Sequence, residues 1–189
     1  MVKIIANDIR PGQILEHNGK LWVVAKIMHT QPGKGGAYMQ VEMKDIKTGT
    51  KLNERFRSSE TVEKVRLDES EYQYLYQEGD HYTLMDLETY DQIHVSEEVI
   101  GDALPYLQEG ITVKVESYEG APISLSVPDT MVFTVAEADA VVKGQTAASS
   151  YKPAVLENGV RIMVPPFIEV GTRVVVKTAD STYVERAKD

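Results

Sequence analysis

Cysteine is absent from the 189-residue sequence, and no run of about eighteen consecutive apolar residues occurs. The first absence excludes disulfide bonds, thiolate metal sites and a cysteine nucleophile, and it is typical of proteins from a reducing compartment. The second excludes a transmembrane helix. The opening residues, MVKIIANDIRPG, also lack the apolar core of a secretory signal. We therefore predict a cytoplasmic protein that makes no membrane contact.

The motifs of common enzymes are missing as well. Gly33 and Lys34 would be the GK pair of a phosphate-binding P-loop, but that motif needs glycine where Met28 stands and Ser or Thr where Gly35 stands. No GxSxG nucleophile motif occurs. A carboxylate-pair hydrolase stays open without positive support. The four histidines are scattered and form no HExxH-like pair, so no metal site is predicted. They are His17, His29, His81 and His94. The sequence indicates a protein that is not an enzyme.

Charge is divided unevenly along the chain, although the net charge is −9. Residues 1–64 carry 11 Lys and Arg against 7 Asp and Glu, whereas 65–128 carry 2 against 14 and 129–189 carry 7 against 8. Such segregation indicates parts that face different partners. The basic part could bind phosphate, and the acidic part could repel or mimic it. An acidic middle that only adds solubility is the alternative.

The first third has the pattern of consecutive β-strands at 20–28, 38–46 and 51–57, with a turn at 47–50. In the middle strand Met39, Val41 and Met43 alternate with polar residues, as in a strand with one buried face. Short connections between such strands predict a small SH3-like barrel.

The remaining sequence repeats itself. Residues 107–120 align with 168–181, and 87–95 align with 156–164. The first copy carries eight extra residues, where Ser96 followed by two glutamates predicts a short helix. Two related β units predict a pair of OB-like barrels. The domain limits are predicted at 1–64, 65–128 and 129–189. Small residues, glycine and proline predict an exposed loop over 143–154.

The segment PGKGGAY, residues 32–38, raises a separate question, because it surrounds one lysine with glycines. Glycine costs such a loop conformational entropy and allows close backbone approach to a partner. A solvated hairpin tip is one interpretation. The basic surroundings favour contact with phosphate instead, and Tyr38 could stack on a base or pack locally. The accompanying cations are Lys44, Lys47, Lys51, Arg55 and Arg57.

The chain resembles bacterial elongation factor P at these residues, and the resemblance extends over its full length. The matching segments, in order, are IRPGQILEHNGKLWVV, PGKGGAY, KTGT followed by Phe56, and the C-terminal YKPAVLENGVRIMVPPFIEVGTRVVVKTADSTYVERAK. The resemblance implies an all-β chain of three small barrels. They are an N-terminal KOW/SH3-like domain and two OB-fold domains, in an L-shaped, tRNA-like arrangement.

The resemblance also implies a function. Members of this family act without catalysis of their own, as monomers that bind the ribosome between the peptidyl and exit sites. There they relieve stalling at consecutive prolines. The implied tRNA-facing tip is Pro32, Gly33, Lys34, Gly35 and Gly36, with Lys34 reaching toward the CCA end of the peptidyl-tRNA. No cofactor is implied, but a modifying enzyme would add a β-lysyl or similar group to Lys34.

A second RNA contact is implied in the last third. Gly144, Gln145 and Thr146 occupy the place of the family's usual Gly-Asp-Thr, near the exit-site codon. Gln145 keeps hydrogen-bonding capacity but lacks the aspartate's charge. Tyr183 and Arg186 match C-terminal aromatic and basic positions that face RNA, although a strand residue and a surface cation would look the same.

Three alternatives compete with this interpretation, and the sequence argues against the first of them. The archaeal and eukaryotic relatives with a hypusine loop typically have Gly-Lys-His-Gly and no third domain, unlike Lys34-Gly35-Gly36 and residues 129–189 here. A paralogue of the factor and a generic β-barrel RNA-binding module are the others.

Overall fold

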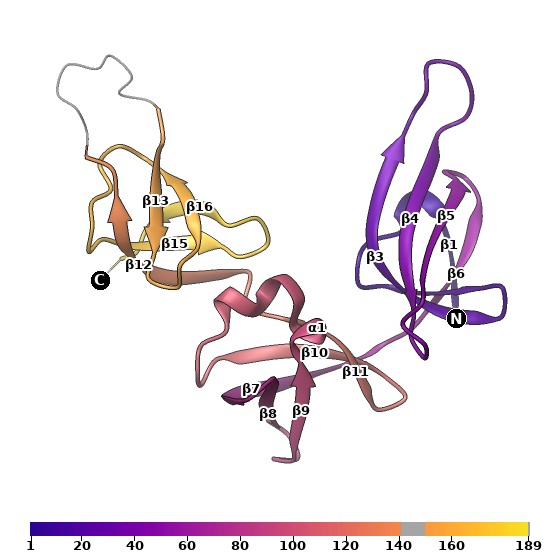
Figure 1. Cartoon of the computed structure of the whole chain (residues 1–189), viewed down its shortest axis with the longest axis horizontal. Helices are drawn as coiled ribbons and strands as arrows, with labels where there is room; N and C mark the ends of the chain where they lie inside the picture. Colours follow the sequence, from indigo (N-terminus) through magenta and orange to yellow (C-terminus); the bar gives the residue numbers. More distant parts are fainter. Residues whose placement is uncertain (141–149, 189) are drawn as a thin grey trace. The chain divides into compact units, whose positions relative to one another are not determined.

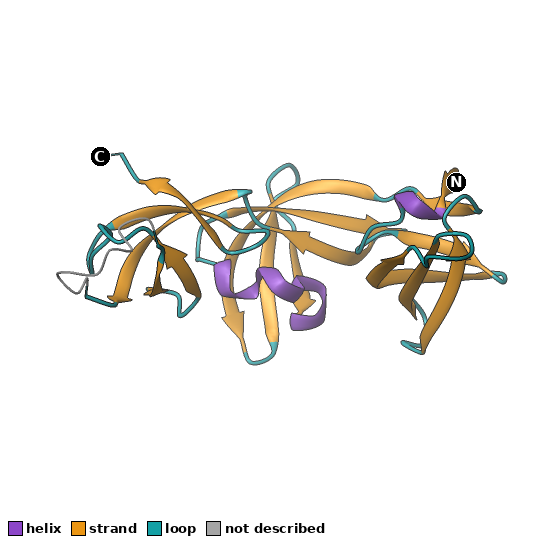
Figure 2. Ribbon diagram, turned by 90° about the horizontal axis from the view of Figure 1, so that it is seen from above, coloured by secondary structure: helices purple, strands orange, loops and turns teal. Residues whose placement is uncertain are grey.

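The computed structural model describes residues 1–140 and 150–188. Strands dominate it, and the helical segments are short (Figure 2). The all-β prediction is confirmed, with three β-sheets along the chain (Figure 1). The predicted domain limits stay a prediction, because compactness divides the chain into two units, Met1–Glu69 with Glu116–Ser124 and Ser70–Val115 with Leu125–Asp189.

The first sheet has six strands in the order β1-β6-β2-β3-β4-β5. Their bounds are β1 Val2–Ile5, β2 Ile14–His17, β3 Lys20–Thr30, β4 Tyr38–Asp45, β5 Lys51–Arg57 and β6 Thr61–Val65. A short 3-10 helix, η1 (Ala6–Asp8), follows β1. The three predicted strands are confirmed, and Met39, Val41 and Met43 lie in the core as their alternation predicts. Other members of this core are Ala6, Ile9, Leu15, Trp22, Val24, Phe56 and Val62.

A β-bulge at Ala25 changes which face of β3 points inward. Val24 pairs with Met43, but the next pair along is Lys26 with Glu42, so Ala25 is the extra residue. Inward positions are even-numbered before the bulge and odd-numbered after it. Lys26 and Met28 therefore lie on the outer face of the sheet.

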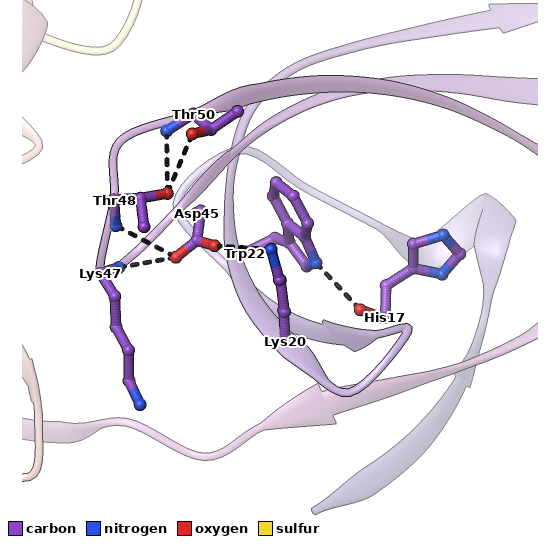
Figure 3. Close-up of polar contacts among 7 residues, drawn as sticks. All are labelled: His17, Lys20, Trp22, Asp45, Lys47, Thr48 and Thr50. Atoms are coloured by element: carbon purple, nitrogen blue, oxygen red, sulfur yellow. Dashed lines mark hydrogen bonds and ion pairs between the residues drawn. The ribbon is translucent and has the colours of Figure 1, made fainter.

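The turn after β4 is organised by Asp45 (Figure 3), and this residue is only 6% exposed. Its Oδ1 accepts hydrogen bonds from the backbone N–H groups of Lys47, at 2.8 Å, and Thr48, at 3.3 Å. The Lys20 ammonium lies 3.8 Å from Oδ2. The Lys47 N–H is the main group that lowers the pKa of Asp45 below its usual 3.8, helped by Thr48 and Lys20 against the opposing effect of burial.

A pH-dependent contribution to stability follows from this carboxylate. Since its pKa is lower folded than unfolded, its stabilisation is present above about pH 3.8 and is lost as the pH falls through the folded pKa. Asp45→Asn keeps an acceptor but removes the charge. We expect a lower urea midpoint than wild type at pH 7 and a difference that shrinks below pH 3.8. A difference that stays constant between pH 7 and about pH 2.5 would contradict this assignment.

The second and third sheets confirm the predicted repeat. The second runs β11-β10-β7-β8-β9 and the third, read from β16, runs β16-β15-β12-β13-β14, so strands that correspond in chain order hold the same places. Tyr90 and Gly159, which the repeat aligns, both have left-handed backbones, with φ of 63° and 84°. The bounds are β7 Asp68–Glu78, β8 His81–Asp86, β9 Gln92–Ser96, β10 Thr112–Tyr118, β11 Ala121–Ser126, β12 Thr130–Ala138, β13 Lys152–Leu156, β14 Arg161–Val164, β15 Arg173–Lys177 and β16 Thr182–Arg186.

Two local predictions have different outcomes. The helix predicted after Ser96 is present as α1 (Glu97–Ile100), followed by the 3-10 helix η2 (Gly101–Tyr106). The loop predicted over 143–154 is wrong at its end, because β13 already starts at Lys152. Ala154 pairs with Ile162 and is 3% exposed, so sheet pairing and core packing decide the structure where the local composition favours a loop.

Tyr106, in η2, belongs to the core of the third sheet. Its side chain is 2% exposed, and its ring centroid lies 5.7 Å from that of Phe133 on β12. Its hydroxyl is hydrogen-bonded to the Ser181 hydroxyl, and the Asn158 amide donates to the Pro105 carbonyl at 3.0 Å. The η2 segment therefore packs on the third sheet.

Among the described residues, no helix is long and apolar enough to cross a membrane.

Candidate functional site

The lysine loop comprises residues 31–37, between β3 and β4 (Figure 1). Thr30 and Tyr38 form the last pair of the hairpin before it. Lys34 lies in the bend of the loop with an exposed side chain. Among the described residues its ammonium has no hydrogen-bond or ion-pair partner. The loop therefore presents one unpaired cation.

The three glycines of the tip differ in what they permit. Gly35 has φ of 114°, a conformation that L-residues rarely adopt, and a Cβ there would lie 3.8 Å from Pro32 Cγ. Gly33 and Gly36 lie outside the left-handed region, and the space that a Cβ would occupy at either position is open. The bend thus requires glycine at position 35, whereas the roles predicted for Gly33 and Gly36 stay predictions.

A pair of alanine variants tests this difference. Gly35→Ala places a side chain where the backbone costs on the order of 1–3 kcal/mol, so the exposed loop should rearrange. We expect altered amide chemical shifts across residues 33–36 in the NMR spectrum. Gly36→Ala is the matched control and should change only its immediate neighbours. Equal perturbation by the two variants would contradict the assigned bend.

The outer face of β4 and β5 carries the cations that accompany the loop. Alternate residues of paired strands share a face. On this face the pairs are Tyr38 with Arg57, Gln40 with Arg55, Glu42 with Asn53, and Lys44 with Lys51, while Lys26 on β3 pairs with Glu42. We call Lys26, Lys44, Lys51, Arg55 and Arg57 the basic face. Lys47 lies exposed in the turn after β4.

Tyr38 packs against an arginine of this face. The guanidinium carbon of Arg55 lies 4.2 Å from the centre of the Tyr38 ring, a cation–π contact. Of the two interpretations that the sequence leaves open for Tyr38, local packing is therefore realised on one side of the ring. The contact also holds the Arg55 charge beside the start of the loop.

The base of the loop contains contacts of Ser58 that the sequence did not indicate. The Ser58 backbone N–H donates to the Ala37 carbonyl at 3.0 Å, and the Ser58 hydroxyl lies 3.4 Å from His29 Nε2. These groups are 21 and 29 residues apart in the chain. No local sequence signal marks them, because the contact exists only once β5 is paired with β4.

The residues predicted in the last third are only partly described. Gly144, Gln145 and Thr146 lie outside the described residues. Tyr183 and Arg186 are on β16, three residues apart. Tyr183 pairs with Val176, Glu185 with Val175 and Arg186 with Val174, so Val184 is an extra residue. This bulge places Tyr183 and Arg186 on the same face, whereas simple alternation would separate them.

Tyr183 lies in an aromatic environment. Its ring meets that of Tyr151 edge-on, with centroids 6.4 Å apart. Burial raises the pKa of the Tyr183 hydroxyl above its usual 10.0 and Tyr151 adds to this, whereas Arg186 opposes it. The hydroxyl is therefore neutral and able to donate. Beside it lies an open hollow of about 500 Å³, lined also by Tyr151, Pro153, Arg161, Ile162, Met163, Asp180, Ser181 and Thr182.

The cations and aromatic rings of these two regions are suited to binding a ligand. In residues 1–140 and 150–188 no three His, Asp or Glu side chains are grouped to hold a metal ion. The first compact unit offers an unpaired ammonium beside a basic sheet face, and the second offers an aromatic and a basic side chain on one face of β16. Cations and aromatic rings of this kind bind the phosphates and bases of nucleic acids.

Comparison with known proteins identifies the family. Three family models match: the elongation factor P KOW-like domain over residues 5–62, its OB domain over 67–125, and the elongation factor P C-terminal model over 131–186. Elongation factor P of Erythrobacter litoralis is 60% identical over 186 residues, which is 98% of this chain and all of that protein. That of Rhodospirillum centenum is 56% identical over 188 residues and covers both chains in full.

A solved structure, eukaryotic translation initiation factor 5A from Methanococcus jannaschii, is 23% identical with a TM-score of 0.42 and covers 67% of this chain and 92% of its own. The two relatives are 60% and 56% identical to this chain over nearly its full length, and the three family models match successive segments of it. The whole sequence therefore belongs to one group. The chain belongs to the elongation factor P family.

Proposed function

We propose that this translation elongation factor binds the ribosome between the peptidyl and exit sites and relieves stalling at consecutive prolines. Lys34 reaches toward the CCA end of the peptidyl-tRNA. The observation that carries the proposal is the unpaired, exposed Lys34 ammonium in the bend of a loop next to the basic face.

The physical basis of the effect is positioning. Proline is a constrained and poor nucleophile, and a prolyl chain can hold the peptidyl-tRNA out of line for attack. A protein that steadies the acceptor end lowers the barrier by reducing the entropy lost on reaching the reactive geometry. The ribosome supplies the catalytic groups, and the factor performs no catalysis of its own.

The basic face supplies affinity without sequence preference. Cations on a sheet surface attract the RNA backbone, and such attraction weakens as salt rises. Arg55 is held in place by the Tyr38 ring at 4.2 Å, so less side-chain entropy is lost on binding. This face and the loop then contact one tRNA, with the loop closest to its end.

Lys34 is also the proposed site of modification. Its amine is exposed and unpaired among the described residues, so a modifying enzyme can reach it. A β-lysyl or similar group would lengthen the cationic arm that the loop presents. We propose further that the factor acts in the cytoplasm as a monomer.

A second contact is proposed in the last third, near the exit-site codon. Gly144, Gln145 and Thr146 would meet RNA by hydrogen bonds, with Gln145 uncharged where the family usually has aspartate. Tyr183 and Arg186 support this assignment because they share one face of β16, and Tyr183 also lines the open hollow. An aromatic ring and a guanidinium together can hold an unpaired base.

The test is peptide synthesis on purified ribosomes, with the protein purified from its native cells. Synthesis of a tri-proline peptide should be faster with the factor than without it, and synthesis of a peptide without prolines should not change. Equal rates with and without the factor on the tri-proline template would overturn the proposal. RNA binding without acceleration would favour the generic RNA-binding module.

A further inference from the structure

We infer that Ser58 is a positioning residue that holds both limbs of the lysine hairpin, at His29 near the end of β3 and at Ala37 at the end of the loop, and so sets where Lys34 points. The inference rests on the proposed function of Lys34. It concerns a residue in the turn between β5 and β6, 24 residues from Lys34 in the chain.

The first tie holds the limb that enters β4. The last pair of β4 with β5 is Tyr38 with Arg57. One residue further, the Ser58 N–H donates to the Ala37 carbonyl at 3.0 Å, which continues the strand pairing into the loop. Among the described residues, it is the only backbone–backbone hydrogen bond between this loop and a residue outside it.

The second tie is to β3 itself, two residues before the loop begins. His29 pairs with Met39, which pairs in turn with Phe56, so His29 lies on the inner face of the sheet. Ser58 follows Phe56 by two residues and lies on that same face. Its hydroxyl is 3.4 Å from His29 Nε2. One serine therefore contacts both limbs, through its backbone N–H and its side chain.

Ser58 can act as an anchor because its own turn is held by the core. Its carbonyl accepts from the Asn7 N–H at 3.1 Å, and the Glu60 carbonyl accepts from the N–H of Ala6, which is fully buried, at 2.8 Å. The Glu60 side chain also accepts from the Arg57 N–H at 3.0 Å. The turn is thus fixed to η1 on one side and to the lysine loop on the other.

This anchoring matters because the loop has little else to order it. Glycines at 33, 35 and 36 provide no side chains for packing and leave many backbone conformations accessible. If the two limbs move, the Lys34 ammonium samples a larger volume. The peptidyl-tRNA that it steadies then spends less time in the reactive geometry. Loss of the Ser58 hydroxyl should therefore reduce the effect of a bound factor and leave binding almost unchanged, since the basic face is intact.

The experiment compares three serine variants of the full chain. Ser58→Ala removes the hydroxyl and keeps the backbone bond, Ser58→Thr keeps both, and Ser59→Ala changes the exposed neighbour as a matched control. Amide hydrogen exchange at residue 58, whose N–H donates to the Ala37 carbonyl, should become about three- to tenfold faster in Ser58→Ala after correction for intrinsic exchange rates, as expected for the loss of one hydrogen bond. Ser58→Thr and Ser59→Ala should exchange like wild type.

Tri-proline synthesis gives the functional readout. In Ser58→Ala the rate at saturating factor should fall severalfold, while the factor concentration for half-maximal effect changes less than about twofold, because positioning rather than docking is lost. Ser58→Thr should restore the rate. His29→Ala, which removes the same contact without altering the turn, should reproduce the exchange result of Ser58→Ala.

The outcomes separate this inference from the proposed function. Exchange and saturating rate in Ser58→Ala that match Ser59→Ala would overturn the role of Ser58, even if Lys34 proves essential. Faster exchange in Ser58→Ala with no effect of Lys34→Ala on the rate would overturn the proposed function of Lys34 and leave Ser58 as an anchor of the loop alone.

Discussion

Replacing Lys34 by alanine is expected to abolish most of the acceleration of tri-proline synthesis, a loss on the order of 10- to 100-fold in the factor-dependent rate. The side chain is exposed and unpaired among the described residues, so its removal breaks no contact within the protein. Folding should therefore be unchanged, and the effect would arise only at the ribosome. The measurement is the rate of tri-proline synthesis at saturating factor.

Two further variants make the result specific. Lys51→Ala removes a cation from the opposite end of the basic face, where Lys51 pairs with Lys44, and should alter the half-maximal concentration more than the saturating rate. Lys34→Arg keeps a charge but cannot accept a lysine modification, so we expect impaired activity. Equal acceleration by wild type and Lys34→Ala would reduce the loop to a docking element. Near-normal activity of Lys34→Arg would argue against the modification.

The largest effect on stability is expected at Tyr106. Tyr106→Ala removes a ring that is 2% exposed and in contact with Phe133, which should destabilise the second compact unit by about 3–5 kcal/mol. Tyr106→Phe keeps the ring and loses only the hydroxyl bond to Ser181, at a cost of about 1 kcal/mol. Urea unfolding followed by far-UV circular dichroism measures both.

The sequence provides an internal control for this experiment. Its only tryptophan, Trp22, lies in the core of the first compact unit, so tryptophan fluorescence follows that unit. The fluorescence midpoint should not move in Tyr106→Ala. Phe167→Ala, which truncates a ring that is 64% exposed between β14 and β15, should change stability by no more than about 0.5 kcal/mol. A similar loss in both variants would contradict the role given to Tyr106.

Local pattern predicted most of the fold. The alternation of Met39, Val41 and Met43 identified a strand and its buried face, because side chains of a strand alternate between two sides. The internal repeat identified two units of the same strand order, since similar sequences place turns and buried positions alike. Composition failed over Lys152–Ala154, where pairing with β14 outweighs a weak local preference for loop.

Part of the candidate site could also be predicted from the sequence, and part could not. Lys34, its glycines and the cations of β4 and β5 are close together in the chain, so the sequence alone determined that one lysine stands in a bare loop beside a basic strand pair. Three features were decided only by the tertiary structure. The bulge at Val184 brings Tyr183 and Arg186 to one face, the stack of Arg55 on Tyr38 fixes a charge, and Ser58 reaches both limbs of the loop. Each depends on which strands pair and in which register, and register is set by the burial of a whole face rather than by any short segment.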